Sequence, residues 1–374
     1  MKSNRLPYIP TDEQELLLKA ALLTDSNAAS CWREWRQRAN LDHLDSGSFR
    51  LLPLAYVNLQ GYELQDPFIG KMKGIYRRSW LTNRLIEKET REIVAALGVD
   101  TLVLKGLALT IQYYEDFGSR PMEDSDVLVR LPDLELVFAR LAERGWIPID
   151  PVSMKRVPYI HSVNYRHPDK EGFDLHWHVI EECCRPSDDA LFWEDAVALE
   201  LNGGIDAFAL SSTDQLFHVL VHGARWNIVP PIRWVPDALM ILRGAGESLQ
   251  WDRLLGLSEQ MRLSLPVFDT LRYLKDTFDA GIPDDVLIKL GQIPATSIER
   301  SEYSNKLAPL TPFRRMKFHW YNHLRQTYDR STIWQLFHWP IYLRYRWGYG
   351  GASDLPAFAV SKMKHYKSLS SRAP

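Results

Sequence analysis

Apolar residues in the first quarter of the chain recur at intervals of three to four, which is the spacing of amphipathic helices. The pattern covers residues 11–97, where segments such as NRLIEKETREIVAAL place their apolar side chains on one helical face. Thr11 is a suitable N-terminal cap at its start, and Gly98 is a suitable stop at its end. We therefore expect an all-helical N-terminal region.

After Gly98 the apolar runs become shorter. DTLVLKG and SDVLVR are typical of short buried strands, and each is followed by a segment with helical spacing. HSVNYRH and GFDLHWHV flank the polar turn HPDKEG, which predicts a hairpin. Helical periodicity returns from Thr213 onward.

This order of elements predicts an α+β protein in which a small mixed β-sheet is flanked by N- and C-terminal helical regions. We divide the chain into an N-terminal helical region, an α/β core, a C-terminal helical region and a basic, aromatic-rich tail, with bounds at 1–97, 98–210, 211–310 and 311–374.

The composition is that of a globular protein: 45% of the 374 residues are hydrophobic and 25% are charged. No apolar run reaches the roughly 18 to 20 residues needed to span a bilayer, and the N-terminus lacks the apolar centre of a signal peptide. The three cysteines cannot form a disulfide framework, and their spacing matches no zinc site. We therefore expect a cytoplasmic protein with no integral membrane segment.

The net charge of −2 conceals a basic tail. Residues 301–374 contain 12 Lys+Arg and 3 Asp+Glu, a balance of +9, and they also contain 15 aromatic residues. Such a segment can be a packed helical pair, a surface on which nucleic-acid bases stack, or, over residues 331–350, a contact with an anionic membrane.

The sequence Asp124-Ser125-Asp126 stands at the start of a predicted strand. Because side chains alternate along a strand, the two carboxylates point to one face roughly 7 Å apart, where they repel each other unless a positive group lies between them. An aspartate pair at a strand end can also cap a turn or bind arginines. Asp174, in the second hairpin strand, can however lie beside this pair. Three carboxylates on adjoining strands favour a two-metal Mg²⁺ site and, with it, phosphoryl or nucleotidyl transfer.

Several segments carry a family resemblance: LKGLAL, SRPMEDSDVLV, FDLHWHV, LSSTDQLFHVLVHGARWN and RWVPDALMIL. Together they resemble the bacterial nucleotidyltransferase-like family, which is often functionally uncharacterised and is related to the polymerase-β-type nucleotidyltransferase superfamily. The similarity extends from the N-terminal helices to about residue 260. It implies a nucleotidyltransferase core at 98–210, with metal ligands and catalytic groups at Asp124, Asp126 and Asp174.

The resemblance also implies nucleotide contacts. A lysine-glycine turn takes the place of the glycine-serine phosphate loop of many relatives, which maps to Lys105 and Gly106. A glycine leaves room for phosphate, and a lysine supplies a mobile positive charge. Arg120 can reach a triphosphate or pair with Glu115, Asp116 or Glu123. His176, two residues after Asp174 on the same strand face, is a candidate for a phosphate or base contact.

Two further residues, His222 and Asp237, are candidates to contact the substrate or to hold the residues that contact it. His222 lies four residues after His218 on one helix face, but no glutamate follows His218 as it does in zinc hydrolases. Both histidines can therefore also be buried core residues with no role in binding. Asp237 precedes an apolar helical segment, so it can also serve as a cap.

These observations predict an enzyme that uses Mg²⁺ to transfer a nucleoside monophosphate from an NTP, such as ATP, to an acceptor hydroxyl or phosphate, with release of pyrophosphate. A kinase-type phosphotransferase on the same fold is one alternative, and an RNA-binding protein with a non-catalytic core is another. The sequence does not identify the acceptor, which can be a small molecule, a peptide, a protein or RNA, nor the base of the NTP or the oligomeric state.

Overall fold

The N-terminal region consists of helices, as its apolar spacing predicts. In this computed structural model, which describes residues 6–183, 185–202, 204–226, 230–309 and 311–348, four helices precede the first strand: α1 (Asp12–Leu22), α2 (Asn27–Arg38), α3 (Ser46–Leu59) and α4 (Phe68–Leu97). The side chain of Thr11 accepts a hydrogen bond from the Gln14 amide and forms a capping box at the start of α1. Gly98 ends α4 in the left-handed conformation, with φ +61°.

A mixed sheet follows, which confirms the predicted fold class. Within the described residues it has seven strands in the order β3-β4-β5-β2-β1-β7-β6. Their bounds are β1 (Thr101–Leu104), β2 (Ser125–Val129), β3 (Ile147–Pro148), β4 (Ser162–His167), β5 (Lys170–His176), β6 (Val197–Leu201) and β7 (Ile205–Ala209). Strand β1 is parallel to β7 and β2 is parallel to β5, whereas the other neighbours are antiparallel.

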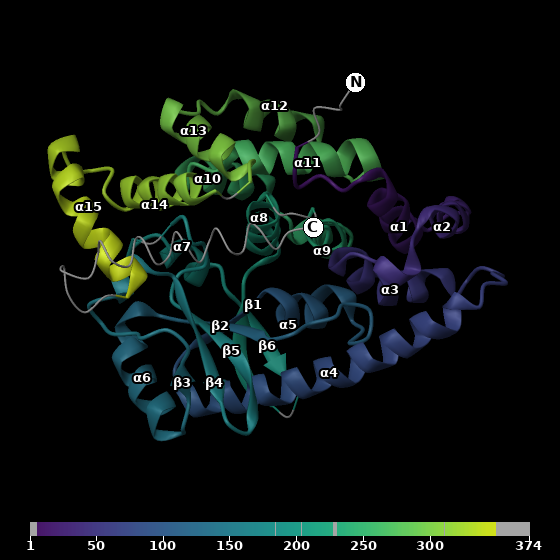
Figure 1. Cartoon of the computed structure of the whole chain (residues 1–374), viewed down its shortest axis with the longest axis horizontal. Coiled ribbons are helices and arrows are strands. Elements are labelled where there is room, and N and C mark those ends of the chain that lie inside the picture. Colours follow the sequence, from purple (N-terminus) through teal and green to yellow (C-terminus); the bar gives the residue numbers. More distant parts are fainter. Residues whose placement is uncertain (1–5, 184, 203, 227–229, 310, 349–374) are drawn as a thin grey trace.

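The alternation of side chains along β2 places Val127 and Val129 on one face of the sheet and Asp126 and Leu128 on the other. Val127 and Val129 pack in a cluster with Val137 and Leu141 of α6 (Leu134–Glu143) and with residues of α4. Asp126 directly precedes Val127, so its side chain points to the opposite face of the sheet. In Figure 1, α4 runs along the side of the sheet away from helices α8 and α9.

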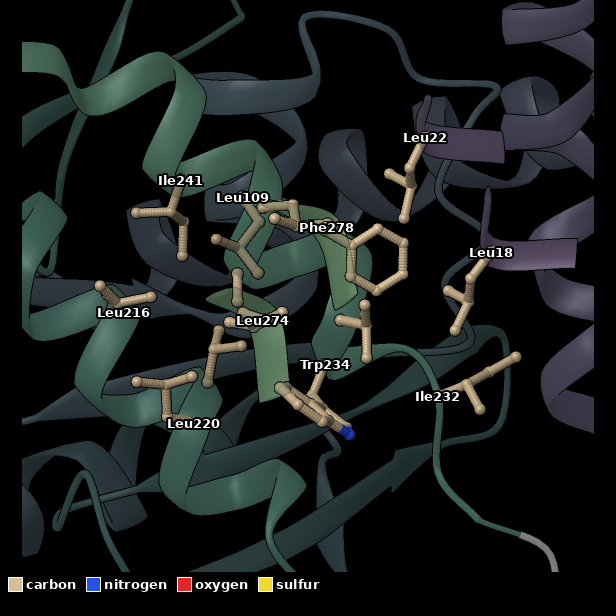
Figure 2. Close-up of a cluster of buried hydrophobic side chains, with 14 of the residues drawn as sticks. Leu18, Leu22, Leu109, Leu216, Leu220, Ile232, Trp234, Ile241, Leu274 and Phe278 are labelled. Atoms are coloured by element: carbon tan, nitrogen blue, oxygen red, sulfur yellow. The ribbon is translucent and has the colours of Figure 1, made fainter. Parts of the chain in front are cut away.

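The largest buried cluster joins helices from both ends of the chain. In Figure 2, Leu18 and Leu22 of α1 lie in the same apolar cluster as Leu216 of α8 (Ser212–Gly223) and Leu274 of α11 (Ser264–Phe278). The other helices after β1 are α5 (Lys105–Leu109), which continues as a π-helical turn over Thr110–Tyr114, α7 (Ala190–Glu194), α9 (Trp234–Ala245), α10 (Trp251–Gln260), α12 (Asp284–Gln292), α13 (Ser297–Lys306), α14 (Pro312–Gln326) and α15 (Thr332–Trp347). The division into four regions stays a prediction, and this shared core joins the first and third of them.

The tail residues as far as 348 form a packed pair of helices, α14 and α15. The Trp320 and Trp339 rings meet edge to face with their centroids 5.1 Å apart. The outer face of α15 remains apolar, because Ile333 is 69% exposed and Phe337 is 80% exposed. The last part of the predicted tail, residues 349–374, lies outside the described residues.

No helix in the described part of the chain combines the length and apolarity needed to cross a membrane.

Candidate functional site

The parallel pairing of β2 and β5 brings two of the predicted carboxylates together. Asp126 and Asp174 are direct neighbours in the register of the two strands. His176 follows Asp174 by two residues and therefore shares its face of the sheet. The three side chains meet on the face away from α4 and α6.

One ionisable side chain lies between the two carboxylates, and a lysine binds one of them. His176 Nε2 is 3.1 Å from Asp126 Oδ1 and 2.9 Å from Asp174 Oδ2. Lys105 Nζ donates a hydrogen bond of 2.5 Å to Asp126 Oδ1. The repulsion expected between neighbouring aspartates is thus relieved by lysine and histidine.

The same contacts set the charge states of the cluster. Burial acts to raise the pKa of Asp126, but Lys105 and His176 outweigh it and hold that pKa below its usual value. In Asp174 burial is likewise outweighed by His176, and the pKa is lowered. Burial and Lys105 act to lower the pKa of His176, yet the two carboxylates raise it overall. The lowered pKa values favour ionised carboxylates at Asp126 and Asp174.

The cluster offers ligand atoms for a cation. Asp126, Asp174 and His176 each present one such atom, and these atoms lie within 4.8 Å of one another. The second oxygen of Asp174, Oδ1, is buried without a hydrogen-bond partner. A buried carboxylate oxygen without a donor is an unfavourable arrangement that a bound cation relieves.

Asp124 occupies a different position from its two predicted partners. It precedes β2, is exposed, and lines the cavity next to the cluster, whereas His176 takes the third place beside Asp126 and Asp174. Although Asp124 is exposed as a whole, the cavity walls shield its carboxyl from part of the solvent, and this partial burial together with the nearby Asp126 raises its pKa.

The cavity in front of Asp126 has a volume of about 340 Å³. Its walls come from the β1–α5 junction, the segment before β2, and helices α8 and α9. Charged and polar lining residues are Lys105, Arg120, Glu123, Asp124, Asp126, His218, His222, Arg225, Arg233 and Asp237. A volume of this size suits a ligand held by several charged groups.

Lys105 and Gly106 form the sharp junction between β1 and α5. Lys105 has a left-handed backbone, with φ +49°, which is uncommon for a residue with a side chain and is often found at functional sites. A Cβ atom at Gly106 would lie 2.8 Å from both Arg120 Nη1 and Met122 Sδ. Gly106 is therefore needed for close packing against the residues behind it, whatever contact it makes with a ligand.

Arg120 and Asp237 form a buried ion pair. The guanidinium donates two hydrogen bonds to the carboxylate, of 2.7 and 2.8 Å, and the Tyr114 hydroxyl donates a third, of 2.8 Å. Both charged side chains are 8% exposed.

The partners predicted for Arg120 were therefore wrong. Asp116 binds the Tyr76 hydroxyl, and Glu123 pairs with Arg50. Asp237, in the first turn of α9, binds Arg120 in place of the predicted capping role. The two residues are 117 positions apart, so their pairing depends on the tertiary fold.

His218 and His222 lie one turn apart on α8 and face the cavity. Burial, followed by the charge of Lys105, lowers the pKa of His218 to about 3. Burial and then Arg225 lower the pKa of His222, although its side chain is exposed to the cavity. Both imidazoles are therefore neutral at pH 7 and suited to accept or donate hydrogen bonds.

Sequence reasoning assigned no role to Arg225 or Arg233, two other arginines in the cavity wall. Arg233 stands immediately before α9, in the segment RWVPDALMIL, and Arg225 follows α8. The sequence alone does not indicate this role, because the place of both residues in the wall depends on how α8 and α9 pack around the cavity.

Comparisons with known proteins found a matching family model and a similar solved structure. A family model described as "Uncharacterised nucleotidyltransferase" matches residues 48–279. Among solved structures, the chain is similar to an antigenic nucleotidyltransferase-like protein from Paracoccidioides brasiliensis, with 15% identity, a TM-score of 0.35, and coverage of 58% of this chain and 94% of that one. No curated protein matches the sequence. Because the family model spans more than half of the chain, this protein belongs to the family of uncharacterised nucleotidyltransferases.

Proposed function

We propose that this protein transfers a nucleoside monophosphate from an NTP to an acceptor hydroxyl or phosphate, with Mg²⁺ as cofactor and pyrophosphate as the leaving group. The observation that carries the proposal is the cluster of Asp126, Asp174 and His176, whose ligand atoms lie within 4.8 Å of one another beside a cavity lined by both basic and acidic side chains. Carboxylates next to positively charged groups are what a metal-bound triphosphate requires.

The side chains fit a divalent cation. Asp126 and Asp174 supply the oxygen ligands that Mg²⁺ prefers, and His176 supplies a nitrogen that Mn²⁺ accepts as well. Asp124, at the cavity side of the cluster, is placed to contribute to a second ion. When bound, Mg²⁺ supplies positive charge that stabilises the phosphate oxygens during transfer.

The chain's own residues would act on the substrates in distinct ways. Asp174, whose Oδ1 has no hydrogen-bond partner, is suited to accept the proton of the acceptor hydroxyl. Lys105 has a flexible stem and can turn from Asp126 to a phosphate oxygen. Gly106 and the Arg120–Asp237 pair keep the β1–α5 junction and α9 in place around the cavity.

A melting experiment tests nucleotide and metal binding together. Each of the four NTPs is added with Mg²⁺, with Mn²⁺ or with a chelator. We expect at least one NTP to raise the melting temperature only when the metal is present. Asp174→Asn should abolish this metal-dependent rise. A melting temperature that no metal and nucleotide combination changes would contradict the proposal.

The products distinguish nucleotidyl from phosphoryl transfer. Mass spectrometry of candidate acceptors, incubated with the stabilising NTP, should show the addition of a nucleoside monophosphate. Addition of a single phosphate would identify a kinase-type phosphotransferase instead. Binding of RNA without metal-dependent turnover would favour a non-catalytic core.

A further inference from the structure

The charged residues of the cavity wall are almost all paired with one another. Lys105 pairs with Asp126, and Arg120 pairs with Asp237. Glu123 pairs with Arg50, outside the cavity. A ligand that displaced these partners would have to offset the loss of an existing ion pair.

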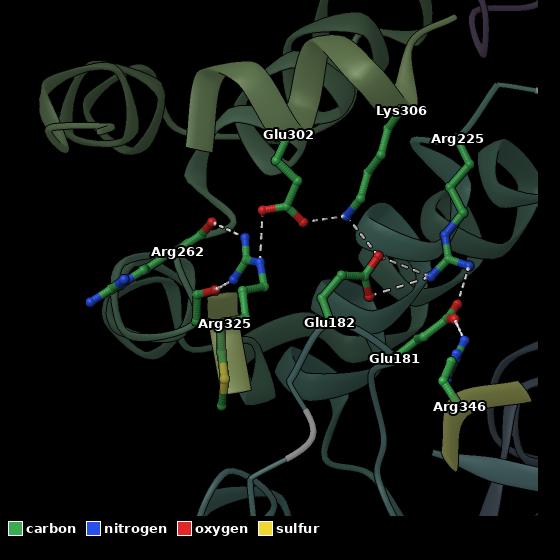
Figure 3. Close-up of polar contacts among 9 residues, drawn as sticks. Glu181, Glu182, Arg225, Arg262, Glu302, Lys306, Arg325 and Arg346 are labelled. Atoms are coloured by element: carbon green, nitrogen blue, oxygen red, sulfur yellow. Dashed lines mark hydrogen bonds and ion pairs between the residues drawn. The ribbon is translucent and has the colours of Figure 1, made fainter. Parts of the chain in front are cut away.

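Arg225 is also paired. Its Nη2 lies 3.3 Å from Glu182 Oε1, and its Nη1 lies 3.6 Å from Glu181 Oε2. Figure 3 shows that the two glutamates point to Arg225 from the segment after β5 and also bind Lys306 and Arg346. The carboxylates thus fix Arg225 in the wall, and their charge is shared among Arg225, Lys306 and Arg346.

Asp124 and Arg233 are the exceptions. Among the charged lining residues, these two form no ion pair within the described part of the chain. The one hydrogen bond that the Arg233 guanidinium donates to a described residue is a long one, 3.5 Å, to the Pro121 carbonyl oxygen. An unpaired carboxylate and an unpaired guanidinium therefore face one cavity.

The surroundings of Arg233 add positive potential. It is the residue before α9, a helix of 12 residues whose first turn also lines the cavity through Trp234. The N-terminal end of a helix carries a partial positive charge and directs amides toward anions. Burial and the neighbouring Arg120 lower the pKa of Arg233 and outweigh Asp237 and Glu123, neither of which forms an ion pair with it.

A ligand that satisfies both groups must carry a cation and an anion together. A polyphosphate with a bound divalent ion has this property, because its metal can meet a carboxylate while its terminal oxygens meet a guanidinium. A simple anion leaves Asp124 unsatisfied, and a simple cation leaves Arg233 unsatisfied.

We propose that Arg233, and not Arg120, is the arginine that binds the triphosphate chain, with Asp124 on the metal side of the same ligand. This assignment rests on the proposed function, because it takes a metal-bound NTP as the ligand. Arg120 remains bound to Asp237 and positions the wall. Arg233 is then a binding residue, and its guanidinium suits bidentate contact with phosphate oxygens better than an ammonium does.

Calorimetric titration of the whole chain with Mg²⁺-tripolyphosphate tests the assignment, since this probe has the charged groups of the ligand and no base. We expect Arg233→Ala to weaken binding by roughly tenfold or more and Arg233→Lys to retain part of the affinity. Arg130→Ala is the matched control, because this substitution also removes one positive charge. Arg130 follows the far end of β2 and is 44% exposed. We expect it to leave the affinity unchanged.

Two further measurements separate the possible failures. Mn²⁺ binding without phosphate should be the same in wild type and Arg233→Ala, since Arg233 contacts the anion. The melting temperature of Arg233→Ala should not fall, since no ion pair is lost. Equal affinity of wild type and Arg233→Ala for Mg²⁺-tripolyphosphate overturns the assignment and leaves the proposed function standing. Wild type that binds the probe through Arg233 but transfers no nucleotide overturns only the proposed function, and wild type that binds neither probe nor NTP overturns both.

Discussion

Asp124 and Asp126 are separated by one residue but differ in environment. Asp126 accepts hydrogen bonds from Lys105 and His176 and is 7% exposed. Asp124 lies in the cavity wall and forms no ion pair with a described residue. One carboxylate therefore contributes to the stability of the folded chain, whereas the other is held against repulsion from its neighbours.

Substitution by asparagine should separate these roles. Asp126→Asn removes the counter-charge of Lys105 and leaves His176 with Asp174 alone, so we expect the free energy of unfolding to fall by about 1–3 kcal/mol. Asp124 has a raised pKa, so its ionisation opposes folding at neutral pH, and Asp124→Asn should leave stability unchanged or increase it. Denaturant unfolding at pH 7 without metal measures both changes.

Both variants should nevertheless lose affinity for Mn²⁺ with tripolyphosphate, which titration calorimetry can follow. A marked loss of stability in Asp124→Asn would show that this carboxylate has a structural partner. Unchanged metal affinity in both variants would exclude the pair from the metal site.

At this scale, alternation and spacing predicted the cluster in part. The placement of Asp174 beside Asp126 follows from the pairing of two strands whose existence the sequence indicated. The sequence also placed His176 on their face, but not its position between both carboxylates. Arg233 escaped notice because its distinguishing property is the absence of a partner, which only the folded arrangement reveals.

At the scale of elements, the cavity depends on how closely α8 approaches α9. Gly223, the last residue of α8, packs directly on Trp234, the first residue of α9. A Cβ atom at Gly223 would lie 2.4 Å from both Cβ and Cγ of Trp234, and the Cβ of a tryptophan cannot move without its backbone. The glycine therefore sets the distance between two walls of the cavity.

Gly223→Ala should force the two helices apart and lower the free energy of unfolding by about 1–3 kcal/mol. The control is Gly256→Ala, in α10, where an added Cβ meets no atom within 4 Å. That substitution should raise stability by about 0.5–1 kcal/mol, since alanine favours the helix over glycine. Chemical denaturation measures the free energy of unfolding of both variants. If Gly223→Ala left it unchanged, α9 would not be fixed by this contact.

Helix and strand patterns predicted most elements but missed the β6–β7 hairpin. The segment VALEL in β6 contains alanine, leucine and glutamate, all of which favour helices, so its alternation was a weak signal. The hairpin forms because β7 pairs with β1: Leu102 and Val103 of β1 align with Phe208 and Ala209 of β7. Non-local pairing of this kind leaves little trace in a single sequence.

At the scale of the whole molecule, buried ion pairs connect the sheet to the C-terminal helices. In Figure 3, Glu181 binds Arg346 of α15, and Glu182 binds Lys306 of α13 at 2.7 Å. Arg325 of α14 binds Glu302 at 2.8 Å. The basic character of the described tail is thus used in part to neutralise acids elsewhere in the fold, which its amino-acid composition alone could not show.

These pairs should make the whole molecule sensitive to acid. Burial acts to raise the pKa of Glu181, but Arg346 outweighs it and the pKa is lowered to about 2. Burial is likewise outweighed in Glu182 by Lys306 and Arg225, so its pKa also lies below the usual value of 4.5. A glutamate with a lowered pKa stabilises the fold when the pH is above 4.5, and this contribution is lost as the pH falls toward the folded-state pKa.

Glu182→Gln tests this link, because it keeps the shape of the side chain but leaves Lys306 and Arg225 without this counter-charge. At pH 7 we expect it to lower the free energy of unfolding by about 3 kcal/mol, since Glu182 is 1% exposed. The difference from wild type should shrink as the pH falls below 4.5, because the Glu182 carboxyl of the unfolded wild-type chain then takes up a proton while the folded one resists it. Asp285→Asn is the control: its pair with Lys289 is exposed to solvent, so melting should hardly change at either pH. If the Glu182→Gln difference stayed constant from pH 7 to pH 3, the loss would come from packing and not from charge, and the network would not account for acid sensitivity.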